Sequence, residues 1–291
     1  MDANDALLPE ALLDRILEKL ALPAEPPPDL DGLSEVYAAW CSKVPFDNLR
    51  KLIHVGSGNP APLAGDDVVE FFEAWLAWGT GGTCWAGNGA LCVLLRTLGF
   101  DAVRGVATMM VAPDLPPNHG TVVVTLDGRR WLVDASMLFA RPLPLLEDEE
   151  TRIEHPSRGV RCAKKDGKWT VSWRPLHMPN GLDCRIDALS ATAADYHRFH
   201  EATRGWSPFN YAANARTNRG DAVVGVAFRQ KMRIAADGTL SMAPIDHRER
   251  QRILVEEVGI HPELVDRIPE DRETPPPPWT AAASAGGGSG G

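Results

Sequence analysis

The segment around Cys84 combines a nucleophilic side chain with a local pattern that could activate it. Residues 79–89 are rich in glycine and cannot all form regular helix, because glycine costs about 1 kcal/mol relative to alanine there. Residues 91–98 carry leucines at helical spacing, and Gly99 follows where such a helix would end. We therefore expect a loop to place Cys84 at the start of a buried helix, where free backbone N–H groups and the helix dipole favour a thiolate. The alternative is an unreactive buried cysteine, the usual state of a free thiol.

A histidine and an aspartate are predicted to meet on one face of a β-hairpin. Two apolar runs flank Asp127-Gly128, which is a strong signal for a two-residue turn. Pairing across this turn places residue 121 opposite Asp134, so that His119 lies diagonally across from Asp134 on the same face. Such neighbours are roughly 7–8 Å apart, within reach of an imidazole and a carboxylate.

Together with Cys84, His119 and Asp134 would supply a nucleophile, a base and an orienting acid, which is the arrangement that activates a thiol. The alternatives are that Asp134 caps a turn and that His119 ends a strand at the surface. A metal site built from the same three residues is possible by ligand type, but their spacing fits no common zinc pattern, and no metal is expected. The other histidines show no comparable set of partners: His54, His155, His177, His197, His200, His247 and His261.

The composition narrows the class of protein. The chain of 291 residues is 44% hydrophobic and 24% charged, which predicts a soluble globular protein of two domains or of one core with an added subdomain. A net charge of -9 argues against nucleic acid or an anionic membrane as the main partner. Five cysteines without paired spacing indicate neither a disulfide framework nor a zinc site. With no signal peptide pattern and no membrane-length apolar run, we expect a cytoplasmic protein.

The period of the apolar residues predicts helices first and strands later. Amphipathic helices are expected over 9–22 and 33–40, and a third, capped by Asp66, over 67–78, so that with the Cys84 helix they form a bundle. Residues 45–49 are expected to form a compact turn.

From Ala102 onward, strands and hairpins are expected to form a small barrel or curled sheet. Residues 187–203 then predict a helix, 223–234 and 239–242 a hairpin, and 249–258 a helix closed by Gly259. Residues 274–291 predict a disordered tail or a linker.

The order of the motifs resembles that of the arylamine N-acetyltransferases. In that family a Pro-Phe-Glu-Asn-Leu segment precedes Arg-Gly-Gly-x-Cys-Phe-Glu-x-Asn, and a histidine and Trp-Leu-x-Asp follow. The counterparts here are Pro45-Phe46-Asp47-Asn48-Leu49, Gly81-Gly82-Thr83-Cys84-Trp85-Ala86-Gly87-Asn88, His119 and Trp131-Leu132-Val133-Asp134. The likeness covers about residues 10 to 270 in order.

The resemblance implies an α+β fold with the triad Cys84, His119 and Asp134 at the interface between its first two parts. These parts are an N-terminal helical bundle over residues 1–100, a central β-barrel over 101–186 and a C-terminal α/β lid over 187–273. The tail covers residues 274–291. The resemblance also implies ping-pong acyl transfer, in which Cys84 takes an acyl group from an acyl-CoA such as acetyl-CoA. A small-molecule amine, hydrazine or hydroxylamine would then accept it.

Around the triad, the resemblance leads us to expect two sets of binding residues. Contacts to the substrate are expected from Phe46, Trp85, Met137 and Phe209, and contacts to the CoA cosubstrate from Gly120, Thr121 and Ser207. Basic residues near the lid are candidates for binding the CoA phosphates: Arg216, Arg219, Arg229 and Lys231. A second basic group is expected to be a solvated hairpin edge: Arg161, Lys164, Lys165 and Lys168.

Four departures from the family pattern lie beside the expected pocket. Thr80 replaces the arginine and Asp47 the glutamate of an expected ion pair, Ala86 replaces a second glutamate, and residues 135–138 differ from the usual Val-Gly-Phe-Gly. The donor and the acceptor therefore stay open. The main alternative is an amide or ester synthase of natural-product biosynthesis that takes its acyl group from a carrier protein. Less favoured are a transglutaminase-like or hydrolytic thiol enzyme and a non-catalytic binding protein.

Overall fold

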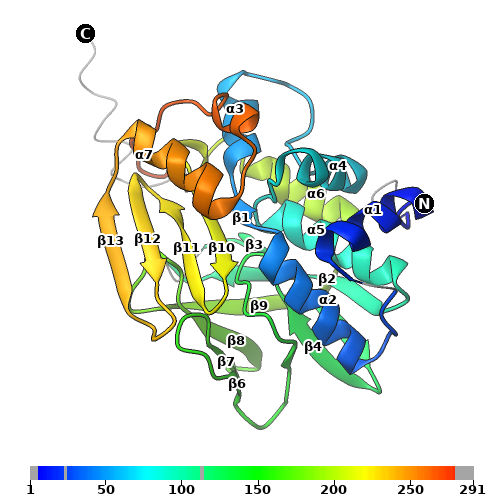
Figure 1. Ribbon diagram of the computed structural model, residues 1–291. Coiled ribbons are helices and arrows are strands. Elements are labelled where there is room, and N and C mark those ends of the chain that lie inside the picture. Colours follow the sequence, from blue (N-terminus) through cyan, green and yellow to red (C-terminus); the bar gives the residue numbers. More distant parts are fainter. Residues whose placement is uncertain (1–5, 23–24, 112–114, 279–291) are drawn as a thin grey trace.

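The computed structural model describes residues 6–22, 25–111 and 115–278. Helices form the N-terminal part on one side of the molecule, with two antiparallel sheets beside and below them (Figure 1). The N-terminal helices are α1 (Glu10–Leu20), α2 (Leu30–Lys43), α3 (Leu49–Gly56), α4 (Val68–Trp78) and α5 (Cys84–Thr97).

Two local predictions in this part were wrong. Helix α3 was not predicted, because its short sequence follows a proline-containing turn and carries only Leu49, Lys51 and Leu52 on its buried side. The cap of α4 is Asp67 rather than Asp66, since the Asp67 side chain accepts a hydrogen bond from the N–H of Glu70 at 2.8 Å.

The central helix α5 is buried from Cys84 through Leu95. It packs against α4 on one side and against the strands of the larger sheet on the other. A helix in such a position has no solvent face to keep polar, which explains its apolar sequence after the glycine-rich start. The helix is therefore a fixed support for the side chain at its first position.

The larger sheet has eight antiparallel strands in the order β5-β4-β3-β2-β9-β8-β7-β6. It is nearly closed into a barrel, because Thr151 Oγ1 of the edge strand β6 donates a hydrogen bond at 2.7 Å to Pro144 O of the other edge strand, β5. Its strands are β2 (Asp101–Met109), β3 (His119–Leu126), β4 (Arg129–Val133), β5 (Leu143–Pro144), β6 (Thr151–Ile153), β7 (Val160–Lys165), β8 (Lys168–Trp173) and β9 (Leu182–Ala191). The predicted turn at Asp127-Gly128 is confirmed, with positive φ at both residues.

Strand β9 corrects the prediction of a helix over 187–203. Residues 182–191 pair with β2 and β8, and the helix α6 (Ala193–Ala202) begins only after them, with Thr192 and Asp195 in a reciprocal capping box. The expected boundary at residue 186 thus falls inside β9.

The smaller sheet joins the N-terminal helical part to the C-terminal part of the chain, because β1 pairs with β10 in the order β1-β10-β11-β12-β13. Its strands are β1 (Phe46–Asp47), β10 (Ala215–Arg219), β11 (Ala222–Ala227), β12 (Gln230–Ile234) and β13 (Leu240–Pro244). Residues 223–234, predicted as one strand, form two, because Phe228 and Arg229 turn the chain with positive φ although neither is a usual turn residue.

Short helices complete this part of the molecule beside the smaller sheet (Figure 1). They are the 3₁₀ turn η2 (Pro208–Asn210), α7 (His247–Arg252), the π-helical continuation η3 (Ile253–Val258) and α8 (Pro262–Val265). Gly259 closes η3 in the left-handed region, as predicted. Most of the predicted tail lies outside the described residues, and no helix among those described is both long and apolar enough to cross a membrane.

Candidate active site

Cys84 is the first residue of α5, as predicted. Thr83 precedes it in an extended conformation, and the Cys84 side chain is largely buried, with Sγ 3.7 Å from the carbonyl oxygen of Asn118. The glycines before it serve close packing: a Cβ on Gly81 would lie 1.8 Å from Pro45 O, and one on Gly82 would lie 3.0 Å from Cβ of Ala86. They therefore allow the loop to lie against its neighbours, which holds Cys84 in place.

Asp47 anchors this loop where the family pattern has an ion pair. Its carboxylate accepts hydrogen bonds from Thr80 Oγ1 at 2.9 and 3.1 Å, from Gly81 N at 2.7 Å and from Leu49 N at 3.0 Å. Burial raises the pKa of Asp47, against the effect of these hydrogen bonds. The expected loss of the ion pair is thus compensated by neutral donors.

His119 and Asp134 lie together in the interior. Strands β3 and β4 pair with the predicted register, and Nε2 of His119 is 2.7 Å from Oδ2 of Asp134, with both side chains buried. The Cys84 side chain lies close enough to His119 to contribute to the raised pKa of the imidazole. Since Nε2 faces the carboxylate, Nδ1 is the ring nitrogen that remains for the sulfur.

The electrostatics of this group favour a charged imidazole. Burial alone would lower the pKa of His119, but the charge of Asp134, with hydrogen bonds to Asp134 and Cys84, outweighs it and raises the pKa to about 10. Burial opposes ionisation of Asp134 as well, yet the charge of His119 and the hydrogen bonds from His119, Met137 N and Ser136 N lower the pKa of this carboxyl. At neutral pH the pair is therefore imidazolium and carboxylate.

Asp134 is fixed by two further elements. Its Oδ1 accepts from the N–H groups of Ser136 at 2.8 Å and Met137 at 2.9 Å. From α2, Tyr37 Oη donates to the carbonyl of Asp134 at 2.9 Å and accepts from its N–H at 3.1 Å. The carboxylate cannot rotate without breaking several hydrogen bonds, so it orients the imidazole.

Asn88, which was not among the predicted site residues, links Cys84 to the residues that follow His119 and Asp134. It is fully buried on α5, one turn after Cys84, and its Nδ2 donates to Cys84 O at 3.0 Å and to Gly120 O at 2.6 Å. Its Oδ1 accepts from Ala135 N at 2.9 Å. The signal was present, since a polar residue four positions after Cys84 in an apolar helix needs buried partners.

The predicted substrate residues lie on different sides of Cys84. Phe46 packs edge-on against Phe209 with ring centroids 5.5 Å apart, and forms a bridge to Gly82 in the nucleophile loop. Trp85 instead stacks on Phe199 at 5.1 Å, on the side of α6, and Met137 is buried in the main core. The structure thus brings Phe46 and Phe209 together beside the Cys84 loop, and Trp85 contacts a different element, α6.

The predicted CoA-binding residues make contacts within the protein. Gly120 packs against Trp85 and Tyr196, where a Cβ would meet ring atoms at 2.9 Å. Thr121 Oγ1 donates to Val133 O at 3.3 Å, and Ser207 Oγ accepts from Phe209 N at 3.3 Å at the start of η2. A role for these residues toward CoA stays a prediction.

The basic candidates near the lid do not form one cluster, because Arg216 is buried whereas the other three, Arg219, Arg229 and Lys231, are exposed. On the barrel hairpin, Lys164, Lys165 and Lys168 are paired with Glu147, Asp183 and Asp187. These pairs fit the expected solvated edge.

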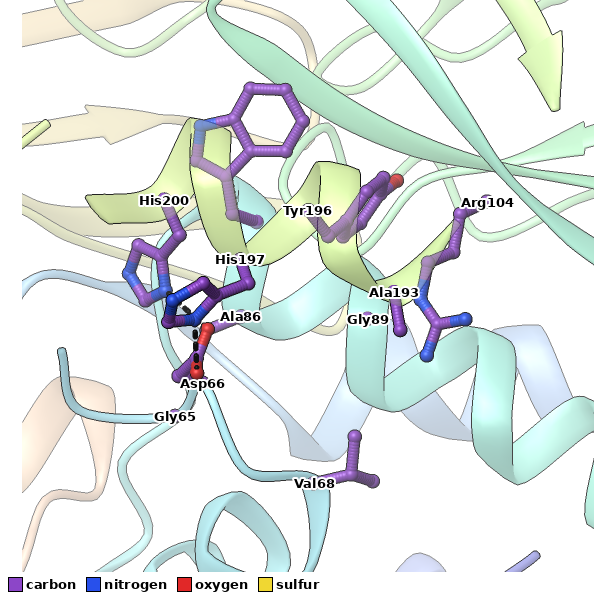
Figure 2. Close-up of a pocket in the computed structure, with 11 residues that line it drawn as sticks. Gly65, Asp66, Val68, Ala86, Gly89, Arg104, Ala193, Tyr196, His197 and His200 are labelled. Atoms are coloured by element: carbon purple, nitrogen blue, oxygen red, sulfur yellow. Dashed lines mark hydrogen bonds and ion pairs between the residues drawn. The ribbon is translucent and has the colours of Figure 1, made fainter. Parts of the chain in front are cut away.

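A second histidine–aspartate group occurs near Ala86, at the start of α5 (Figure 2). Asp66 lies 2.7 Å from Nδ1 of His197 and 3.9 Å from Nδ1 of His200, contrary to the expectation that these histidines lack such partners. They border a cavity of about 20 Å³, the space of about one water, which no cysteine or serine lines. Burial is the main cause of a lowered pKa at His200. Lys51, another residue missed by sequence reasoning, lies nearby in electrostatic contact with Cys84 and His200.

No group of three or more histidine, cysteine or carboxylate side chains suited to a metal ion occurs among the described residues. The five cysteines are all free. With His119 paired to Asp134 beside it, Cys84 is in an arrangement suited to thiol nucleophilic chemistry.

A sequence profile of the N-acetyltransferase family matches residues 29–181, more than half of the chain, and the protein belongs to this family. It is 29% identical over 171 residues to the arylamine N-acetyltransferase of Mycolicibacterium smegmatis, a match that covers 53% of this chain and 60% of the relative. It is 25% identical over 169 residues to an arylamine N-acetyltransferase of Gallus gallus, the pineal gland isozyme, covering 54% of each chain. The chain thus spans between half and two thirds of the curated relatives it matches.

Solved structures share the fold over most of the chain. The arylamine N-acetyltransferase from Mycobacterium abscessus has a TM-score of 0.75 at 20% identity, covering 89% of this chain and 95% of that one. The enzyme from Salmonella typhimurium has a TM-score of 0.72 at 17% identity, covering 96% and 98%. These structures confirm the predicted α+β class with N-terminal helices, a nearly closed barrel and a C-terminal sheet.

Proposed function

We propose that the protein is an N-acyltransferase that moves an acyl group from an acyl-CoA to a small-molecule amine, hydrazine or hydroxylamine through a thioester on Cys84. The observation that carries the proposal is the buried His119 imidazole, which is hydrogen-bonded to Asp134 at 2.7 Å and lies close enough to Cys84 for that side chain to raise its pKa. Family membership supports the reaction class.

In the first half-reaction, His119 as imidazolium pairs with the Cys84 thiolate, which attacks the carbonyl carbon of the acyl-CoA. The C–S bond to CoA breaks, and the CoA thiolate leaves with a proton from His119. The first N–H groups of α5, at Cys84 and Trp85, lack acceptors within the helix and are placed to stabilise the oxyanion.

In the second half-reaction, the amine attacks the acyl carbon of the Cys84 thioester. His119 takes the amine proton, the Cys84 thiolate leaves, and an amide is released. Asp134 keeps the proton of the neutral imidazole on Nε2, so that Nδ1 stays able to exchange a proton beside the sulfur.

The choice of CoA as donor is supported by a structural relative, the arylamine N-acetyltransferase of Mycobacterium marinum determined in complex with CoA (TM-score 0.74, 18% identity, covering 88% of this chain and 97% of that one). Within the proposal, Phe46 and Phe209 contact substrate beside Cys84, and Gly120, Thr121 and Ser207 are candidate contacts for CoA. The five free cysteines fit a reducing compartment such as the cytoplasm.

The direct test is intact-protein mass spectrometry after incubation with acetyl-CoA. We expect one acetyl group on Cys84, lost on addition of an arylamine and never gained by Cys84→Ala. Iodoacetamide should label Cys84 before Cys41, because burial raises the pKa of Cys41 to about 12. If no acyl-CoA loads Cys84 but an acyl carrier protein does, the donor is wrong and the synthase alternative holds. Loading by neither would contradict acyl transfer.

A further inference from the structure

Arg216 is a buried cation that forms no ion pair with any described carboxylate. Its side chain is 5% exposed, and neither Nε nor Nη1 has a hydrogen-bond acceptor. Burial lowers the pKa of Arg216 to about 10, so the guanidinium is still charged at neutral pH. By contrast Arg250, equally buried on α7, is paired with Asp271. An unpaired charge in the interior is strongly unfavourable, which indicates that a missing anion completes this site.

The position of Arg216 on β10 places it next to an expected substrate residue. Arg216 lies directly across from Phe46 of β1, and residues opposite each other in an antiparallel pair project to the same face. Two residues further on that face, Asn218 Nδ2 donates to Leu138 O at 2.8 Å. The face that carries Arg216 is therefore bounded by Phe46 and by the turn that follows Asp134.

Further unsatisfied polar atoms occur on the elements around Arg216. The ring of Trp173, at the end of β8, lies 5.0 Å from the guanidinium carbon. The buried atoms Trp173 Nε1, Ser136 Oγ and Asn218 Oδ1 have no hydrogen-bond partner. Because buried polar groups in folded proteins are almost always paired, a cluster of unpaired ones indicates a place for a polar ligand.

The geometry of the guanidinium selects the ligand chemistry. Contact with the Trp173 ring occupies a face of the group and leaves its in-plane N–H bonds for an acceptor. Two adjacent N–H bonds match the two oxygens of a carboxylate.

We propose that Arg216 binds a carboxylate carried by a substrate that reacts at Cys84. The inference rests on the proposed function, because it assigns a substrate class to that same site. The carboxylate belongs either to the acyl group, as in the half-thioester of a dicarboxylic acid, or to the acceptor amine. Arg216 is then a specificity-determining residue, and the departures at residues 135–138 form part of the pocket around it.

Two matched pairs of substrates separate these sources. For the acyl group, the rate of Cys84 loading is compared for acetyl-CoA and succinyl-CoA by mass spectrometry. For the acceptor, the deacylation rate of acetylated enzyme is compared for 4-aminobenzamide and 4-aminobenzoate. In one of the two pairs, we expect the wild-type enzyme to react faster with the acidic substrate than with the neutral one. Arg216→Met should lower the rate with the acidic substrate by on the order of 10²-fold and change the rate with the neutral substrate little.

Control variants distinguish recognition from a structural role. Arg216→Lys keeps the positive charge but lacks the paired N–H donors of the guanidinium, so it should recover part of the rate preference for the acidic substrate. Arg233→Met, at an exposed position on β12, should leave both rates unchanged. Equal slowing of acid and neutral substrates by Arg216→Met, or no acid preference in either pair, would overturn the proposal.

A measurement on the wild type remains decisive if Arg216→Met does not fold, and it does not depend on acyl transfer. Benzoate should protect Cys84 from iodoacetamide at concentrations at least about tenfold lower than benzamide does. Equal protection, or none, would refute carboxylate binding. If benzoate protects and yet no acyl-CoA loads Cys84, the proposed function fails while the anion site stands.

Discussion

Asp134→Asn changes one atom at the centre of the site and tests the orienting role of the carboxylate. Asparagine Oδ1 can still accept from Ser136 N and Met137 N, which now donate to Oδ1 of the aspartate at 2.8 and 2.9 Å. The Nδ2 amide then faces His119 Nε2 and donates to it. The imidazole must therefore carry its proton on Nδ1, toward the sulfur, and can no longer accept a proton from Cys84.

The size of the effect follows from the pKa of His119. Its rise from 6.5 to about 10 against the effect of burial is a preference for the imidazolium, and the charge of Asp134 does most to produce it. Hydrogen bonding to Cys84 supplies part of this preference, so removing the Asp134 charge should remove most of it. We expect acyl transfer to fall by about 10⁴-fold, the loss that the same substitution produces in a serine triad.

The assay measures the rate of Cys84 alkylation by iodoacetamide and the rate of acyl transfer as functions of pH. Both should fall together at neutral pH in Asp134→Asn, while circular dichroism stays that of the wild type. Asp66→Asn is the matched control, because it removes a carboxylate from His197 and His200 without touching the Cys84 group. An Asp134→Asn enzyme within tenfold of the wild type in both rates would refute the orienting role.

Two further substitutions test the surroundings. Asn88→Ala leaves Gly120 O and Ala135 N unpaired and should cost about 1–3 kcal/mol of unfolding free energy, measured by urea unfolding. It should also slow acyl transfer by up to about 10²-fold, because Cys84, His119 and Asp134 are displaced relative to one another. Unchanged transfer kinetics would contradict a positioning role for Asn88. Burial is the main cause that lowers the pKa of Lys51 to about 7, whereas lysine in the unfolded chain titrates near 10.4. Between these two pH values the unfolded chain binds a proton that the folded chain lacks, so the stability of the wild type rises with pH. Lys51→Met should remove this rise in urea unfolding from about pH 7 to about pH 9, and parallel curves for the two proteins would show that Lys51 is not buried in this way.

Much of the fold could be predicted because local signals agreed with tertiary structure. The Asp127-Gly128 turn fixed the register of β3 and β4, and the leucine spacing after Cys84 fixed α5. The failures came where long-range pairing overrides local preference. Residues 187–191 become strand because β2 and β8 offer them partners on both sides, and the turn at Phe228 carries no residue that favours positive φ.

In the candidate site, too, residues placed by local sequence could be predicted and residues placed by long-range packing could not. The places of Cys84, His119 and Asp134 in the fold could be inferred from helix-start chemistry and hairpin register, since each depends on residues close in sequence. Asn88 and Tyr37 could not be assigned, because their partners are set by how α5 and α2 pack on the barrel. In the sequence, Arg216 was one of four basic candidates for binding the CoA phosphates, and nothing distinguished it from the three that the structure exposes. Only its pairing opposite Phe46 shows that the side chain is turned into the interior.

The two-residue strand β1 connects the fixed and the variable parts of the site. Successive residues of a strand project to opposite faces, so Asp47 points to Thr80 and Gly81 of the nucleophile loop, whereas Phe46 shares its face with Arg216. With Asp47 and Thr80 in place of an arginine–glutamate pair, the loop is anchored through hydrogen bonds from neutral donors. The one buried, unpaired guanidinium identified beside β1 is then on the face away from the loop. A change in substrate charge can therefore be accommodated at Arg216 without moving Cys84, which is why the triad geometry and the proposed specificity can vary independently.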